Sequence, residues 1–104
     1  MEYLCITWKY RSEEDPLEYY IEIDQKRFET RKVETYQNQE FCYTSEEIEL
    51  GTYLSPLPTP TLEELEEDEE IEVVRITKEE FEKVWKLATF DDTTKKRTMW
   101  SNNF

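Results

Sequence analysis

The sequence predicts a single α+β domain, with an antiparallel sheet of four to five strands packed by a C-terminal amphipathic helix. Three observations predict it. Short runs of alternating apolar and polar residues, separated by brief polar turns, fill residues 3–44. An apolar stripe with helical spacing follows near the C-terminus. The chain has 104 residues, the usual size of one domain. We assign residues 1–88 to this domain and expect residues 89–104 to form a flexible tail.

Four strands are expected in the first half of the chain. Residues 3–10 read YLCITWKY, so Leu4, Ile6 and Trp8 face one side and the intervening residues face the other. Similar patterns predict strands over residues 17–24, 28–36 and 41–44. Connections this short join antiparallel neighbours. The predicted arrangement is therefore a meander.

A linker and a short helix are expected next. Residues 45–60 lack periodicity and contain Gly51 and three prolines, which is typical of an extended linker. Thr61 and Glu64 have the spacing of a capping box, which predicts a short acidic helix of about two turns. Residues 71–76 are rich in β-branched side chains and predict the last strand.

The C-terminal helix has the strongest pattern. Thr77 and Glu80 form a second capping-box pattern. Four apolar residues follow at i, i+3, i+4 and i+7: Phe81, Val84, Trp85 and Ala88. We predict a helix from Lys78 to Ala88 that covers one face of the sheet, with Trp8 and Trp85 in the core.

Several function classes are excluded by what the sequence lacks. It has no His, which removes imidazole catalysis and His-metal sites, and one Gly, which is too few for a phosphate-cradling loop. Cys5 and Cys42 lack the spacing of a zinc or redox motif. We find no signal peptide and no membrane-spanning run, and expect a soluble cytoplasmic protein. No catalytic, cofactor or metal-binding residue is predicted.

The acidic run is the most unusual feature. Between residues 63 and 72, eight of ten side chains are acidic and none is basic: Glu63, Glu64, Glu66, Glu67, Asp68, Glu69, Glu70 and Glu72. Residues 46–76 carry eleven acidic and one basic residue, so most of the net charge of −13 is local. The run could be a solvated face, as most charge runs are. It could also dock a basic partner, because like charges without lysine partners destabilise folding. Calcium-loop spacing is missing, and a carboxylate-pair hydrolase lacks a second motif.

A resemblance to a known family covers about residues 1–88. It is carried by the early strand with Trp8 and by the segments LEYYIEID, IDQKRFETRKVETY, PLPTPTLEEL and ITKEEFEKVWKLA. These resemble a family of small bacterial proteins catalogued as a domain of unknown function and regarded as candidate immunity proteins of toxin systems. The most specific residues are Arg27, Phe28, Glu29, Arg31, Lys32, Val33 and Glu34. Two departures are Asn38-Gln39, where the family turn usually has Gly, and the tail 89–104.

The resemblance implies a protein that binds and blocks a toxin, and it carries no catalytic residue. With the acidic run, it predicts a non-catalytic inhibitor that sequesters a basic toxin such as a nuclease. The alternatives are an acidic nucleic-acid mimic that inhibits a host defence nuclease, and a small enzyme that uses carboxylates. Direct contact with nucleic acid or membrane is not expected at this charge. The sequence leaves the partner's identity and the oligomeric state open.

Two further features have a structural and a functional interpretation. The charged residues of the third strand, Arg27 to Glu34, can form ion pairs across strands or contact a partner. The tail contains Trp100 and a basic triplet over residues 95–97. It can be disordered, fold back onto the acidic run or insert into a partner.

Overall fold

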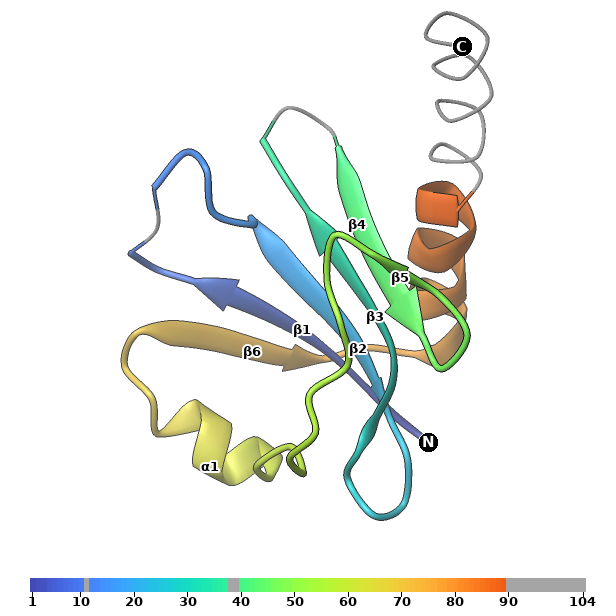
Figure 1. Cartoon of the computed structure of the whole chain (residues 1–104). Coiled ribbons are helices and arrows are strands. Elements are labelled where there is room, and N and C mark those ends of the chain that lie inside the picture. Colours follow the sequence, from blue (N-terminus) through green and yellow to red (C-terminus); the bar gives the residue numbers. More distant parts are fainter. Residues whose placement is uncertain (11, 38–39, 90–104) are drawn as a thin grey trace, which may run out of the picture.

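The described part of the chain folds into an open antiparallel sheet of six strands with two helices (Figure 1). The computed structural model describes residues 1–10, 12–37 and 40–89. The strands are β1 (Glu2–Trp8), β2 (Glu18–Ile23), β3 (Glu29–Thr35), β4 (Phe41–Ser45), β5 (Glu49–Leu50) and β6 (Ile71–Arg75). The helices are α1 (Leu62–Glu66) and an unlabelled C-terminal helix over residues 78–89. The tail from residue 90 lies outside the described residues.

The expected meander is confirmed, since β1, β2, β3 and β4 pair in sequence order and each pair is antiparallel. The alternation read from residues 3–10 sets the register. Leu4 lies opposite Ile21 on one face of the sheet, and Cys5 lies opposite Tyr20 on the other. The last strand, β6, pairs with β1 rather than extending the meander, so it forms the opposite edge of the sheet.

The sheet has one strand more than predicted. β5 contains two residues and pairs with β4 through Tyr43–Leu50 and Thr44–Glu49. Two residues are too few for a recognisable alternation, and the neighbouring Gly51 and prolines indicate a linker instead. Gly51 has a φ of +81°, and a side chain there would collide with Cys42. This position therefore needs glycine both for its backbone angle and for space.

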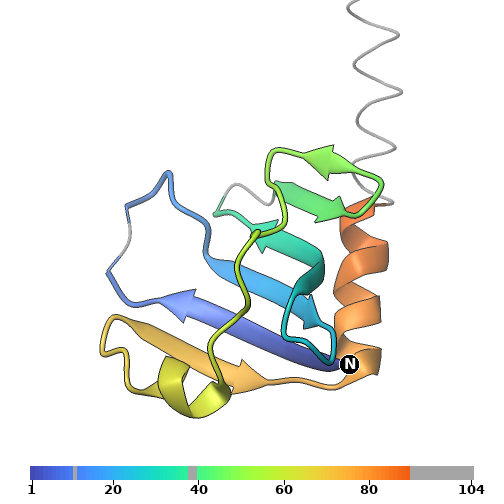
Figure 2. The ribbon, with the colours of Figure 1, turned by 60° about the horizontal axis from the view of Figure 1, so that its bottom comes forward.

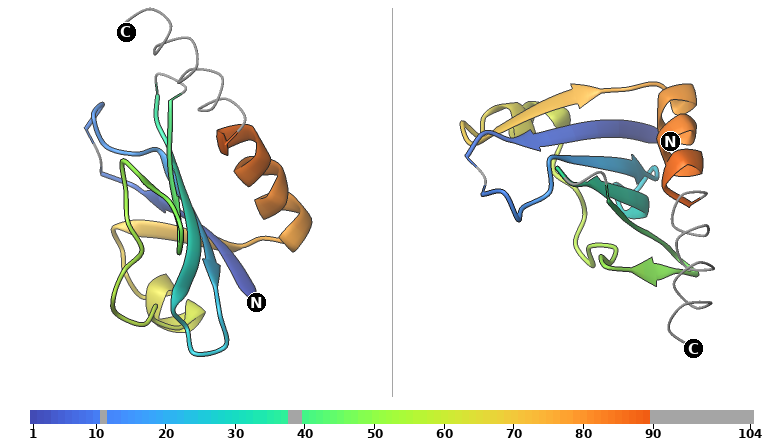
Figure 3. Two further views of the ribbon diagram at one scale, coloured as in Figure 1. Left: turned by 45° about the vertical axis from the view of Figure 1, so that its right-hand side comes forward. Right: turned by 90° about the horizontal axis from the view of Figure 1, so that it is seen from above.

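The two faces of the sheet are covered by different segments (Figure 3). The C-terminal helix packs on one face through Val84, Trp85 and Ala88, against a cluster that includes Val33 and Tyr43. The other face carries Leu4, Ile21 and Ile23. This second face is crossed by the linker over residues 51–61, which runs from β5 to α1 (Figure 2).

The two tryptophans expected in the core differ. Trp85 lies edge-on to Tyr43, with ring centroids 5.5 Å apart, as expected for a core residue. Trp8 is 37% exposed, so the prediction of a core position is wrong for it. It is the last residue of β1, where the sheet ends, and Ile71 opposite it is the buried residue.

Candidate functional site

The acidic run continues from α1 through a turn into β6. Thr61 caps α1: its side chain accepts a hydrogen bond from the backbone N–H of Glu64, and the Glu64 carboxylate accepts one from Thr61 N–H. The predicted capping box is thus confirmed. Leu62 and Leu65 pack against the Leu4 cluster and hold α1 on the sheet. All eight acidic residues of the run are exposed.

Two members of the run have local structural roles. The hydrogen bonds from Thr61 to the carboxylate of Glu64 lower its pKa below the usual value. Asp68 accepts a hydrogen bond from the backbone N–H of Glu70, at 2.9 Å from Oδ1, and so stabilises the turn into β6. These two carboxylates therefore shape the segment. The carboxylates of the other six accept no hydrogen bond from the described residues.

The fold brings further acidic residues to the same end of the sheet. The turn before β6 lies beside the end of β1, because Lys9 N–H donates to the Glu70 carbonyl at 2.8 Å. The loop that leaves β1 carries Glu13, Glu14 and Asp15. Glu13 and Glu14, with Tyr36 and residues 37 and 40, line an open hollow of about 580 Å³. We call this end, with residues 13–15 and 66–70, the acidic end.

Cations are scarce at the acidic end. Within the described part of the chain, no Lys or Arg forms an ion pair with residues 13–15 or 63–72. Lys9 is exposed there and also forms no ion pair with a described residue. The acidic end therefore presents a surface of negative charge that the described residues leave unneutralised.

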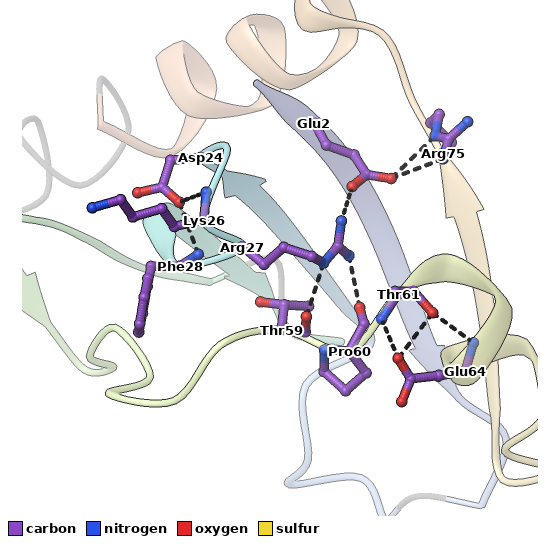
Figure 4. A network of polar contacts seen from close by, with 10 residues as sticks. All are labelled: Glu2, Asp24, Lys26, Arg27, Phe28, Thr59, Pro60, Thr61, Glu64 and Arg75. Carbon is purple, nitrogen blue, oxygen red and sulfur yellow. Dashed lines mark hydrogen bonds and ion pairs between the residues drawn. The ribbon is translucent and has the colours of Figure 1, made fainter.

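The opposite end of the sheet has a network of charge pairs centred on Arg27 (Figure 4). Its guanidinium bonds the carboxylate of Glu2 at 2.5 Å and donates to the carbonyl groups of Thr59 and Pro60 at 2.9 and 2.7 Å. Arg75 contacts the other oxygen of Glu2 at 2.9 Å. Burial alone would raise the pKa of Glu2, but the hydrogen bonds from the two arginines lower it below its usual value.

The backbone of Arg27 is unusual as well. It has a φ of 72°, a left-handed conformation that is uncommon for a side chain of this size. The β2–β3 turn holds it there, because Asp24 Oδ1 accepts from the N–H groups of Lys26 and Phe28. Its carbonyl accepts from Thr59 N–H at 2.6 Å. Arg27 thus joins the turn to the linker that leads into α1 and the acidic run.

A partly buried ion cluster lies under the C-terminal helix. Arg31 donates to both carboxylate oxygens of Glu22, at 2.8 and 2.6 Å, and also pairs with Glu82 of the helix. Its guanidinium carbon lies 4.9 Å from the ring centroid of Phe81 and 5.0 Å from that of Trp85. Burial raises the pKa of Glu22, but the hydrogen bonds from Arg31 and Thr30 lower it to about 2.

The charged residues of the third strand were expected either to form ion pairs across strands or to contact a partner. For Arg31, the cluster supports the first interpretation. Arg31 lies directly opposite Glu22, so it forms the cross-strand ion pair that the structural interpretation predicts. Its contact with the helix was not expected. No local signal was available, because Glu82 lies about 100° around the helix from Phe81, outside the apolar stripe. Only the packing of the helix on the sheet brings Glu82 to Arg31.

The two cysteines form no disulfide within the described residues, and both are half-buried. Burial, together with the nearby Glu18 carboxylate, raises the pKa of Cys5 to about 11. A thiol with this pKa stays protonated at neutral pH and is a poor nucleophile. Among the described residues, no group of three or more potential ligands is placed to hold a metal ion. No described helix is both long and apolar enough to cross a membrane.

Comparison with known proteins shows a family match. The profile of a family described as Domain of unknown function (DUF6881) matches residues 2–90. A search of curated proteins gave no significant match, and neither did a search of solved structures. The match runs from the start of β1 through the C-terminal helix, and it confirms the resemblance to a domain of unknown function. The chain therefore belongs to the family described as Domain of unknown function (DUF6881).

Proposed function

We propose that the chain is a non-catalytic binding protein whose acidic end docks on a basic surface of a partner protein. The observation that supports this is the absence of ion pairs at the acidic end within the described residues, whereas the carboxylates of Glu2, Glu22 and Glu82 pair with arginines elsewhere in the fold. Like charges held together destabilise a fold. A basic partner surface would neutralise these charges. The attraction between the two surfaces would speed association and favour partners with a basic surface.

The local geometry narrows the set of docking residues. Glu64 and Asp68 hold the helix cap and the turn, so they position the others. The proposed contacts are Glu66, Glu67, Glu69 and Glu70, with Glu72 next to them in β6. Glu63 is left out, because it lines a hollow with Arg27, Arg75 and Lys78. Exposed carboxylates of this kind mainly accelerate association, whereas neighbouring apolar contacts hold the complex together.

The finer proposal is that the chain is an immunity-type inhibitor of a basic toxin such as a nuclease. Nucleases bind phosphate groups with lysine and arginine, so an acidic surface has the charge to occupy their substrate site. A host defence nuclease would present the same chemistry. The identity of the bound protein separates these two biological roles.

The test combines capture with kinetics on matched variants. The chain is used to capture partners from the source organism's lysate at low salt, and a basic protein released by a salt gradient is purified. Association is then measured for the wild type and for a variant with Glu66, Glu67, Glu69 and Glu70 changed to Gln. The control variant changes Glu46, Glu47, Glu49 and Glu79 to Gln. These four residues are exposed, away from the acidic end, and alter the net charge equally.

We expect the acidic-end variant to associate about tenfold more slowly than the control variant at low salt, because steering depends on local charge. The wild-type rate should fall steeply as salt rises. Titration of the captured protein's nuclease activity tests inhibition directly. Equal rates for both variants, or an association rate that ignores salt, would contradict the proposal.

A further inference from the structure

The two edges of the sheet are protected unequally. At one edge, β5 has two residues and runs into the proline-containing linker, which keeps the edge short. At the other edge, β6 has five residues, Ile71–Arg75, beyond β1 (Figure 2). Within the described residues no strand pairs with the outer side of β6.

The register of β1 and β6 shows which backbone groups point outward. Lys9 N–H donates to the Glu70 carbonyl and Ile76 N–H to the Tyr3 carbonyl, so these residues form hydrogen-bonded pairs. Such pairs alternate along an antiparallel ladder, so Glu72 and Val74 also bond to β1. The N–H and C=O groups of Val73 and Arg75 therefore point away from the sheet. Among the described residues, no backbone or side-chain group bonds to them.

The side chains of β6 do little to block this edge. The strand reads IEVVR, with no proline. Its two charged side chains are Glu72 and Arg75, and Arg75 is paired with Glu2. Val74 is 59% exposed on the face opposite α1. Val73 faces α1, which packs there through Leu62 and Leu65. The outer edge is thus a short template of unpaired backbone groups with an exposed valine beside it.

We propose that the outer edge of β6 binds an extended basic segment of the partner protein as an additional strand. This inference rests on the proposed function, which supplies a partner with a basic surface. It adds that the partner is held by strand pairing at β6. The acidic end reaches Glu70, the residue before β6, and Glu72 lies within the strand. A segment that pairs with β6 is therefore drawn to it by negative charge. A second copy of the chain is disfavoured, because each copy carries a net charge of −13.

The geometry specifies the pattern of the bound segment. A residue opposite Val73 shares its hydrogen bonds and faces the α1 side of the sheet. The residues on either side of it then lie opposite Glu72 and Val74. We expect Lys or Arg opposite Glu72 and an apolar residue opposite Val74.

The first experiment uses the full chain, isotope-labelled for NMR, and a defined probe. The probe, called the alternating peptide, has about twelve residues with the repeat Lys-Thr-Val-Thr, so that Lys and Val alternate along one face and can lie opposite Glu72 and Val74. It is long enough to span β6. A peptide of the same composition with proline at every third position is the control. We expect amide hydrogen exchange at Val73 and Arg75 to slow at least about tenfold with the alternating peptide and to stay unchanged with the control.

The second experiment removes the edge donor. Val73→Pro deletes an outward N–H that bonds to nothing described, and proline is tolerated on edge strands. Val73→Thr keeps the N–H and the β-branched shape. We expect Val73→Pro to lower the affinity for the alternating peptide at least about tenfold. Val73→Thr should bind the peptide nearly as tightly as the wild type does. If Val73→Pro fails to fold, the exchange measurement on the wild type still shows whether the peptide pairs with the outer edge of β6.

Three results would overturn the inference. The peptide does not bind, or it binds without slower exchange at Val73 and Arg75, or sedimentation shows that β6 pairs two copies of the chain and that Val73→Pro separates them. In each case the proposed function is judged separately, by the kinetics of the acidic-end variant with the captured protein.

Discussion

The two ends of the sheet use the same kind of side chain in opposite ways. At the end with Glu2, a carboxylate lies between two arginines and its pKa is lowered by their hydrogen bonds. At the acidic end, the glutamates of the turn before β6 have no cation paired with them among the described residues. The five ion pairs between described residues lie in the half of the sheet that contains Glu2 and Arg31.

This difference shows that charge in this molecule has two separate tasks. Partly buried carboxylates with arginine partners join the turn, the linker and the C-terminal helix to the sheet. Exposed carboxylates without partners contribute little to folding and remain available for binding. Substitutions at the paired end should therefore affect stability, whereas those at the acidic end should affect association.

The largest effect should come from Arg31→Met. This change leaves Glu22, which is 6% exposed, without its cation, and it removes the link to the helix. Breaking a buried pair from one side costs about 3 kcal/mol or more of the free energy of unfolding. Urea unfolding measures the loss. Lys83→Met, an exposed position on the same helix, is the control and should change stability little. A loss no greater than that of Lys83→Met would mean that the cluster does not fix the helix.

Acid should also remove the stabilisation that the pair of Glu22 and Arg31 gives the folded state. The carboxyl of Glu22 has a reference pKa of 4.5, and in the folded protein its pKa is about 2. The folded state thus favours the carboxylate, and the stabilisation is complete above the unfolded pKa and is lost as pH falls from about 4.5 to about 2. The full contribution is about 3 kcal/mol. Unfolding of the wild type and of Glu22→Gln at several pH values measures it. Curves that stay parallel below pH 4.5 would contradict this assignment.

A smaller loss is expected for Arg27→Ala, which removes the bonds to Glu2, Thr59 and Pro60. Hydrogen bonds of a charged group suggest a loss of about 2 kcal/mol. Arg27→Gly removes the same bonds but also relieves the positive φ, so it should be about 1 kcal/mol more stable than Arg27→Ala. Thermal or urea unfolding compares the two. If Ala is the more stable variant, the backbone of residue 27 is not strained.

The smallest effect on stability should come from the acidic end. Changing Glu66, Glu67, Glu69 and Glu70 to Gln should alter the free energy of unfolding by about 0.5 kcal/mol or less, in the stabilising direction at low salt. The control variant at Glu46, Glu47, Glu49 and Glu79 should behave similarly. Only the first should slow association with a basic partner. A large loss of stability in the acidic-end variant would show that these carboxylates support the fold and would remove the contrast between the two ends.

Much of the fold could be predicted from local patterns. The alternation in residues 3–44 and the stripe of Phe81 and Trp85 indicate their elements because burial on one face requires that spacing. The capping box of Thr61 and Glu64 is likewise a contact between neighbours in sequence. The exposure of the acidic run is predictable for the same reason, because so many adjacent carboxylates cannot all be buried.

Other features were decided by the tertiary structure. β5 exists because β4 offers it a partner, and Trp8 is exposed because the sheet ends beside it. Arg31 reaches Glu82 because the helix packs over the third strand, and the loop with Glu13 reaches the acidic run because β6 pairs with β1. These contacts join residues far apart in the chain, and their free energy depends on burial and distance that no local pattern encodes. The sequence by itself thus determined the elements and the concentration of negative charge, whereas the tertiary structure decided which charges are paired and which remain exposed.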